Sequence, residues 1–218
     1  MQTRLVCLEN THNRGGGRIL PYDGVEQICS WAHENELKTH LDGARLFNAV
    51  VASGISAKKW CQHFDTVSIC FSKGLGAPVG SVLVGSQEIV STLRRHRKLF
   101  GGGMRQSGII SAGALYALDN NIERLSEDHD SASHIAKAIG EIEGVTLAPV
   151  DTNIVIFHIA DRLGTAADFC ERAKAKGVWM FPFGAQQVRA VTHLHISQQD
   201  ADSAANIIAE VAQNPVVA

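Results

Sequence analysis

Short runs of β-branched and other apolar residues alternate with longer segments of helical periodicity, and this alternation constrains the fold more than any other feature. Between residues 22 and 36, apolar residues stand at Val25, Ile28, Cys29 and Ala32, the spacing of one helix face. Similar patterns predict strands over residues 3–8, 37–41, 64–70 and 80–84, the first of them buried, and helices over 22–36, 44–53, 86–99, 107–120 and 122–142. Repeated strand–helix alternation indicates an α/β fold, with a mostly parallel sheet flanked by helices.

The last part of the sequence has a different pattern. Helical periodicity covers residues 165–176 and 198–213, and Ser197 is a plausible N-cap for the second of these helices. Strands are predicted over residues 145–148, 153–159, 178–181 and 188–196. We therefore expect two domains: a larger one over residues 1–125 and a smaller C-terminal α+β domain over residues 126–218.

Composition excludes several classes of protein. The 218 residues include 20 Lys+Arg and 22 Asp+Glu, for a formal net charge of −2, and 45% are hydrophobic. This apolar content is sufficient for a folded protein. The only basic stretch is short, which argues against a nucleic-acid partner, and no apolar run approaches the roughly 18 residues of a membrane span. The N-terminal residues lack the pattern of a signal peptide, so a cytoplasmic location is expected.

The cysteines fit the same compartment. They are five, widely spaced, and form no C-x-x-C pair: Cys7, Cys29, Cys61, Cys70 and Cys170. Their sequence neighbours are mainly apolar. We interpret them as small buried residues of a protein that is kept reduced.

The segment SICFSKGLGAPVGS carries the first candidate for chemistry. Lys73 follows a predicted strand and precedes a loop rich in glycine and proline. An amine in that place is expected to be poorly solvated, which lowers the pKa of a lysine and favours imine formation. On this pattern alone, a lysine in a surface loop is the alternative. The order of residues is not that of a P-loop.

The segment HLDGARLFN carries the second candidate. Asp42 stands at the end of a predicted strand, where ligands bind in open α/β sheets, and Arg45 follows it closely. The two side chains are suited to hold a cationic ring nitrogen and an anion, respectively. The alternative interpretation of Asp42 is an N-cap of the following helix.

Four blocks in chain order resemble one family. LENTHNRGGGRILP, HLDGARLFNA, FSKGLGAPVGS and RRHRKLFGGGMRQSG are similar to segments of the L-threonine aldolases, within the larger β-eliminating lyase group. The resemblance extends to the segment RAVTHLH and so covers nearly the whole sequence. It implies an aspartate-aminotransferase-like fold (fold type I), pyridoxal 5'-phosphate as cofactor, and assembly as a homodimer or homotetramer.

The implied activity is retro-aldol cleavage of the amino acids L-threonine and L-allo-threonine to glycine and acetaldehyde. One alternative is another β-eliminating lyase, which would release pyruvate and ammonia instead. The other is a non-catalytic remnant or assembly partner of such an enzyme.

The resemblance also implies roles for single residues. By similarity, Lys73 binds the cofactor covalently through its amine, and Asp42 keeps the ring nitrogen protonated. Arg45 lies by the cofactor or the substrate carboxylate. Lys98 and Arg105 match residues near the cofactor, and both are candidates to serve the site of a neighbouring subunit.

On the substrate side, Arg189 matches an arginine that clamps the α-carboxylate, a role that suits the bidentate geometry of a guanidinium. His12 matches a histidine of the substrate pocket, as an acceptor of the β-hydroxyl proton or as a group that orients a water. His193 and His195 alternate on a predicted strand and are expected to share one face. No third ligand has a suitable spacing, so no metal site is predicted.

The sequence also departs from the family pattern. Family members carry a long segment ahead of the residues that match Met1, including the Gly–Thr turn that holds the cofactor phosphate and the histidine that stacks on the ring. Without that segment, exposed sheet edges and an uncovered apolar face are expected. The chain is expected to be a fragment of a longer protein. The alternatives are a part completed by another chain and a shortened relative that binds cofactor poorly.

Overall fold

The computed structural model describes residues 2–214, which form two compact units. The first unit contains the chain up to Thr11 together with Ile19–Leu125. The second contains the segment His12–Arg18 together with the chain from Ser126 onward. A short segment near the N-terminus therefore belongs to the same unit as the C-terminal part of the chain.

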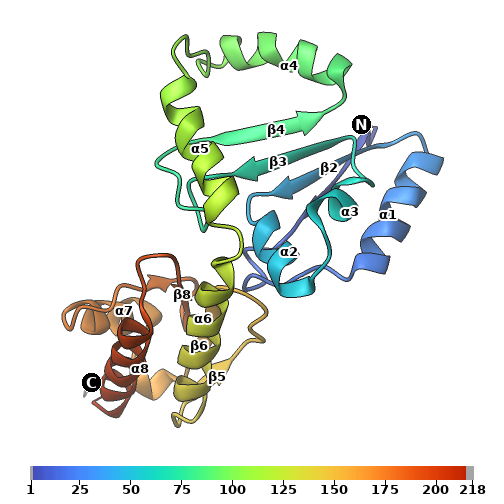
Figure 1. Ribbon diagram of the computed structural model, residues 1–218. Coiled ribbons are helices and arrows are strands. Elements are labelled where there is room, and N and C mark those ends of the chain that lie inside the picture. The colour runs from blue at the N-terminus through green and yellow to red at the C-terminus, as the bar shows by residue number, and fades with distance from the viewer. Residues whose placement is uncertain (1, 215–218) are drawn as a thin grey trace. The chain divides into compact units, whose positions relative to one another are not determined.

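The first unit is built on a four-stranded sheet in the order β1-β2-β3-β4 (Figure 1). Strands β1 (Leu5–Glu9), β2 (Lys38–Gly43) and β3 (Thr66–Cys70) are parallel, and β4 (Ser81–Gly85) is antiparallel to β3. The prediction of a mostly parallel sheet is confirmed. Its register pairs Glu9 with Asp42 and Asp42 with Ser68, so these three residues stand in one row across the sheet.

Three helices pack against one face of this sheet: α1 (Tyr22–Glu34), α2 (Leu46–Ser53) and α3 (Ala57–Cys61). Trp60 of α3 is 1% exposed and joins a core with Leu41 of β2 and Val67 of β3. Helix α3 is not predicted by the sequence pattern, since five residues are too few to display a helical period. Its one local signal is Ser56, whose hydroxyl oxygen accepts a hydrogen bond from the N–H of Lys59.

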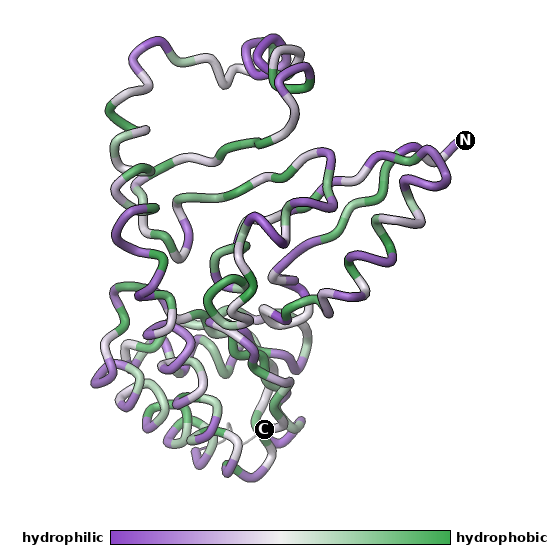
Figure 2. Tube along the Cα trace, turned by 45° about the vertical axis from the view of Figure 1, so that its right-hand side comes forward, coloured by the Kyte–Doolittle hydropathy of each residue, from purple (hydrophilic) through white to green (hydrophobic). Residues whose placement is uncertain are grey.

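Much apolar surface of this unit is exposed. Helix α4 (Gln87–Leu99) buries no residue, and α5 (Gly108–Asn120) leaves Ile109 82% exposed. Figure 2 shows an apolar stretch along strand β4, where Val82, Leu83 and Val84 are all exposed. The expectation of a buried first strand is wrong, because Leu5 is 49% exposed and no described element lies beyond β1 in the sheet. The expected uncovered apolar surface is present.

The second unit is an antiparallel sheet in the order β5-β6-β8-β7, packed against helices. Its strands are β5 (Val145–Leu147), β6 (Ile154–Ile159), β7 (Phe181–Pro182) and β8 (Gln187–Val191). Its helices are α6 (Leu125–Gly140), α7 (Ala166–Lys174) and α8 (Gln198–Gln213), with a 3-10 turn at Asp161–Leu163. Phe157 of β6 and Phe169 of α7 are fully buried, with their rings 6.1 Å apart. The predicted smaller α+β part is confirmed in its fold.

The predicted strand over 188–196 is too long. Strand β8 ends at Val191, and the chain then turns, with the N–H of Ile196 donating to the carbonyl of His193 at 2.7 Å. His193 and His195 therefore do not alternate on a strand. Their rings contact edge to face, with centroids 5.6 Å apart. Within residues 2–214, no group of three or more His, Cys, Asp or Glu side chains is arranged to hold a metal ion.

All five cysteines are free thiols. Cys29 and Cys170 are buried, and burial raises the pKa of each thiol to about 11, with Asp65 adding to the shift for Cys29 and Glu171 for Cys170. The expectation of burial is wrong for Cys7, which is exposed on the edge strand β1. Among the helices described, none is both long and apolar enough to cross a membrane.

Candidate functional site

Asp42 lies near the carboxyl end of β2. Its neighbours Leu41 and Gly43 are buried under the helices, so the exposed Asp42 side chain points to the opposite face of the sheet. One carboxylate oxygen accepts a hydrogen bond from the N–H of Ala44 at 3.0 Å. The residue in the N-cap position of α2 is Arg45, so the interpretation of Asp42 as a helix cap is wrong. Asp42 is available for a ligand at this sheet edge.

Arg45 is half-buried beside this carboxylate. Burial lowers the pKa of Arg45 from its usual value, whereas the nearby carboxylates of Glu9 and Asp42 act in the opposite direction and favour the guanidinium. Glu9 ends β1, and Asp42 lies in the adjacent strand β2. Two carboxylates from neighbouring strands therefore act on one arginine at the carboxyl edge of the parallel sheet.

Lys73 lies in the turn that follows β3, at the same edge. The turn is closed by hydrogen bonds from Gly76 N–H to the Lys73 carbonyl and from Ala77 N–H to the Phe71 carbonyl, both 2.9 Å long. The Lys73 side chain is exposed. The expectation of poor solvation is therefore wrong for the described chain, because nothing in it covers the amine.

Two glycines beside these side chains lie close to neighbouring atoms. A Cβ on Gly43 would lie 2.8 Å from the carbonyl oxygen of Ser68, and a Cβ on Gly74 would lie 2.9 Å from Leu125 Cδ2. A larger residue at position 43 would push β2 away from β3, and one at position 74 would displace the Leu125 side chain. The sequence signal for these two glycines is their position directly after Asp42 and Lys73.

The second unit holds His12 in a tight loop. The His12 N–H donates to the Arg18 carbonyl at 2.8 Å, and the Gly15 N–H donates to Nδ1 of the His12 ring at 3.0 Å. A neutral imidazole has one nitrogen that accepts and one that carries hydrogen. Because Nδ1 accepts, Nε2 carries the hydrogen, and the exposed edge of His12 is a hydrogen-bond donor.

Arg189 lies in β8 of the same unit. Its Nη2 donates a hydrogen bond of 2.8 Å to the side-chain oxygen of Asn13, and its Cζ lies 5.8 Å from the centre of the Phe183 ring. The loop with His12 and the strand with Arg189 are thus joined directly, although Asn13 and Arg189 are 176 residues apart in sequence. The family resemblance indicates His12 and Arg189, but no sequence pattern predicts the contacts of Asn13 and Phe183 with Arg189.

Lys98 and Arg105 stand apart from the other candidates. Lys98 lies in the last turn of α4, Arg105 lies in the segment before α5, and both are exposed. Within residues 2–214, no hydrogen bond or ion pair joins either of them to Asp42, Arg45 or Lys73.

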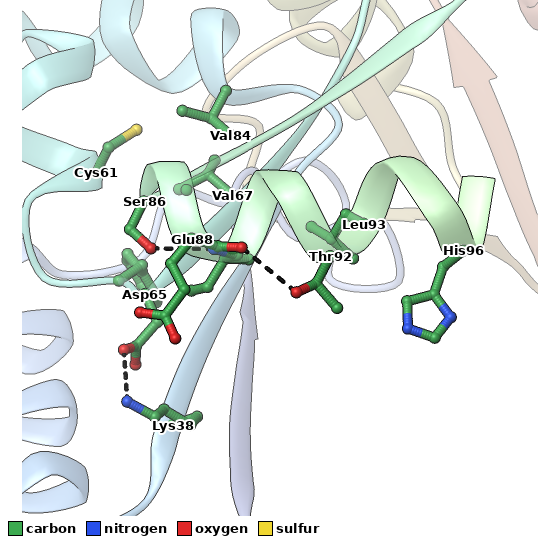
Figure 3. A pocket seen from close by; sticks show the side chains of 13 residues that line it. Lys38, Cys61, Asp65, Val67, Val84, Ser86, Glu88, Thr92, Leu93 and His96 are labelled. Carbon is green, nitrogen blue, oxygen red and sulfur yellow. Dashed lines mark hydrogen bonds and ion pairs between the residues drawn. The ribbon is translucent and has the colours of Figure 1, made fainter. Parts of the chain in front are cut away.

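A cavity of about 730 Å³ opens at the other end of the first unit's sheet. Figure 3 shows Lys38 and Asp65 joined by an ion pair beside the first turn of α4, with Val67 and Val84 among the side chains that line the space. Lys38 begins β2 and Asp65 directly precedes β3. This cavity is therefore at the amino edge, remote from Asp42 and Lys73.

The family model and the curated relatives that match this chain indicate the same family. Residues 1–162 match the family described as Beta-eliminating lyase. The low specificity L-threonine aldolase of Escherichia coli (strain K12) is 43% identical over 198 residues, which are 91% of this chain and 57% of that relative. The chain thus spans a little over half the length of this curated relative.

Solved structures agree in fold. A threonine aldolase from Leishmania major superposes with a TM-score of 0.78 at 19% identity, over 96% of this chain and 61% of that structure. An aspartate aminotransferase from Rhodobacter sphaeroides 2.4.1 superposes with a TM-score of 0.77 at 17% identity, over 98% of this chain and 58% of that structure. The predicted aspartate-aminotransferase-like fold is confirmed. The 43% identity and the match over residues 1–162 together show that this chain belongs to the β-eliminating lyase family.

Proposed function

We propose that the protein is a pyridoxal 5'-phosphate-dependent threonine aldolase, which cleaves L-threonine and L-allo-threonine to glycine and acetaldehyde. The observation that carries the proposal is that Asp42, near the end of β2, and Lys73, in the turn after the adjacent strand β3, lie at the same edge of the sheet. The E. coli relative named a low specificity L-threonine aldolase supports the choice of reaction.

The groups at this edge fit the cofactor. Asp42 offers a carboxylate, whose charge favours a protonated ring nitrogen. Lys73 offers an exposed primary amine for covalent attachment, and Arg45 offers a guanidinium for an oxyanion of the cofactor or the substrate. Pyridoxal 5'-phosphate, when bound, supplies an electron sink for the electron pair left on the substrate Cα when the Cα–Cβ bond breaks. Lys98 and Arg105 are assigned to the cofactor of a neighbouring subunit.

Substrate recognition falls to the second unit. Arg189 binds the α-carboxylate by paired N–H donors. His12 presents Nε2–H, so it orients the β-hydroxyl or a water by donating a hydrogen bond. While Gly15 N–H occupies Nδ1, the ring has no accepting nitrogen for the hydroxyl proton. This geometry favours the orienting role of His12 over the role of proton acceptor.

The same proposal includes the organisation of the molecule. We assign cofactor binding to residues 1–125 and the small domain to residues 126–218, with the loop His12–Arg18 serving the small domain. We also propose a homodimer or homotetramer in the cytoplasm. The free thiols and the exposed apolar residues of α4 and α5 support this part of the proposal.

The test is covalent trapping of the cofactor and analysis of products. The chain is incubated with pyridoxal 5'-phosphate and reduced with borohydride, and peptide mass spectrometry then locates the adduct. We expect it on Lys73. Lys73→Ala should abolish the adduct and lower glycine and acetaldehyde release by at least about 100-fold. Lys58→Ala, which removes an exposed lysine of α3, should change neither.

The same experiment separates the alternatives. Pyruvate and ammonia in place of glycine and aldehyde would identify another β-eliminating lyase. A wild-type chain that forms no adduct would be a non-catalytic remnant or an assembly partner.

A further inference from the structure

We propose that Asn13 and Phe183 are positioning residues, which hold the guanidinium of Arg189 in the orientation that receives the substrate α-carboxylate. This inference rests on the proposed function, because that function supplies the carboxylate. It concerns only residues of the second unit: the loop His12–Arg18 and the strands β7 and β8 with the residues between them.

Arg189 is held on two sides. Asn13 accepts a hydrogen bond from Nη2 at 2.8 Å, and the Phe183 ring lies 5.8 Å from Cζ, within the range of a cation–π contact. The Arg14 guanidinium lies 4.9 Å from the same ring. A guanidinium has five N–H groups in a rigid plane, so holding one nitrogen and one face also fixes the direction of the remaining donors.

The loop that carries Asn13 is fixed independently of the Asn13 side chain. The hydroxyl of Thr152 donates to the Gly17 carbonyl at 2.7 Å, and Arg18 Nε lies 2.7 Å from an Asp151 carboxylate oxygen. The backbone hydrogen bond from the His12 N–H to the Arg18 carbonyl closes the loop. Asn13 is therefore presented to Arg189 by a pre-formed loop, and truncating its side chain should leave that loop in place.

Asn13 is an uncharged hydrogen-bond partner of Arg189. An amide oxygen accepts an N–H without neutralising the guanidinium, so Asn13 itself does not compete with a carboxylate for the positive charge. A carboxylate at position 13 would hold the arginine equally well, but it would form an ion pair that competes with the substrate. Orientation and charge can thus be separated by two substitutions at one position.

The first measurement reports the order of the guanidinium without any cofactor. It is the heteronuclear NOE of the Arg189 Nε–H group in the isotopically labelled chain. We expect a high NOE, typical of an ordered group, in the wild type and in Asn13→Asp. In Asn13→Ala the NOE should fall toward the values of exposed arginines. Phe183→Leu, which keeps apolar contact but removes the ring, should give an intermediate value. Asn206→Ala on the exposed side of α8 is the matched control and should change nothing.

The second measurement is the split between KM and kcat for threonine with the cofactor-loaded chain. We expect both Asn13→Ala and Asn13→Asp to raise KM by about tenfold, with kcat changed by less than about twofold, since about 1.4 kcal/mol of carboxylate binding corresponds to a factor of ten. An unchanged NOE in Asn13→Ala overturns the proposal, as does an unchanged KM alongside normal turnover. A wild-type chain with no turnover refutes the proposed function instead, and the NOE then still decides whether Asn13 orders Arg189.

Discussion

His12 shows how one backbone contact decides the chemistry of a side chain. Gly15 N–H donates to Nδ1, and a Cβ on Gly15 would lie 2.8 Å from that same nitrogen. Gly15→Ala should therefore displace the ring and release Nδ1, so that both neutral tautomers are populated. Long-range ¹H–¹⁵N spectra report the tautomer, and kcat for threonine should fall by about tenfold because the donor is misplaced. Gly108→Ala, where a Cβ meets nothing within 4 Å, is the control. Unchanged His12 nitrogen shifts in Gly15→Ala would contradict this account.

At the scale of elements, Asp65 ties α1 and β2 to the start of β3. Its carboxylate accepts hydrogen bonds from Thr39 N–H at 2.8 Å and Lys38 Nζ at 3.1 Å, and lies 3.4 Å from His33 Nε2. Burial raises the pKa of Asp65, but these bonds from Thr39 and Lys38 outweigh that effect and lower the pKa below its usual value. The unfolded state then binds the proton more readily, so the contribution to stability is present above about pH 4 and is lost as pH falls below it. Asp65→Asn should cost about 1 kcal/mol at pH 6 in urea unfolding and less at pH 3, whereas Asp119→Asn should cost nothing. An equal cost at both pH values would refute the role of the ionised carboxylate.

At the scale of the whole molecule, the exposed apolar surface of the first unit predicts association. Phe100, at the end of α4, is 87% exposed, and Leu99 beside it is 68% exposed. Burying a phenylalanine is worth about 1.5–3 kcal/mol, so Phe100→Ser should weaken self-association by about tenfold or more in sedimentation velocity. Trp179→Ser removes a residue that is 78% exposed in the other unit and should leave association unchanged. If Trp179→Ser weakened association and Phe100→Ser did not, the proposed subunit contact would not include α4.

Most elements were predictable because their signals are local. The periodicity that predicted a helix over 22–36 is realised as α1, with Val25, Cys29 and Ala32 buried. The short apolar run that predicted a strand over 64–70 is realised as β3. The failures also have local causes. Five residues of α3 show no period, and the apolar pattern after Val191 continues through a turn that a neighbouring strand does not pair.

By itself the sequence determined the order of strands and helices, the family blocks, and the candidates Asp42, Lys73, His12 and Arg189. The elements, Asp42 and Lys73 follow from side-chain period and residue type within short windows, whereas His12 and Arg189 follow from the resemblance to the threonine aldolases. Only the tertiary structure decided that His12–Arg18 belongs with the C-terminal unit, that Gly15 sets the His12 tautomer, and that Asn13 contacts Arg189. The physical reason is that a contact across 176 residues, and the direction of a single N–H, depend on how the folded backbone returns on itself, which no local pattern encodes.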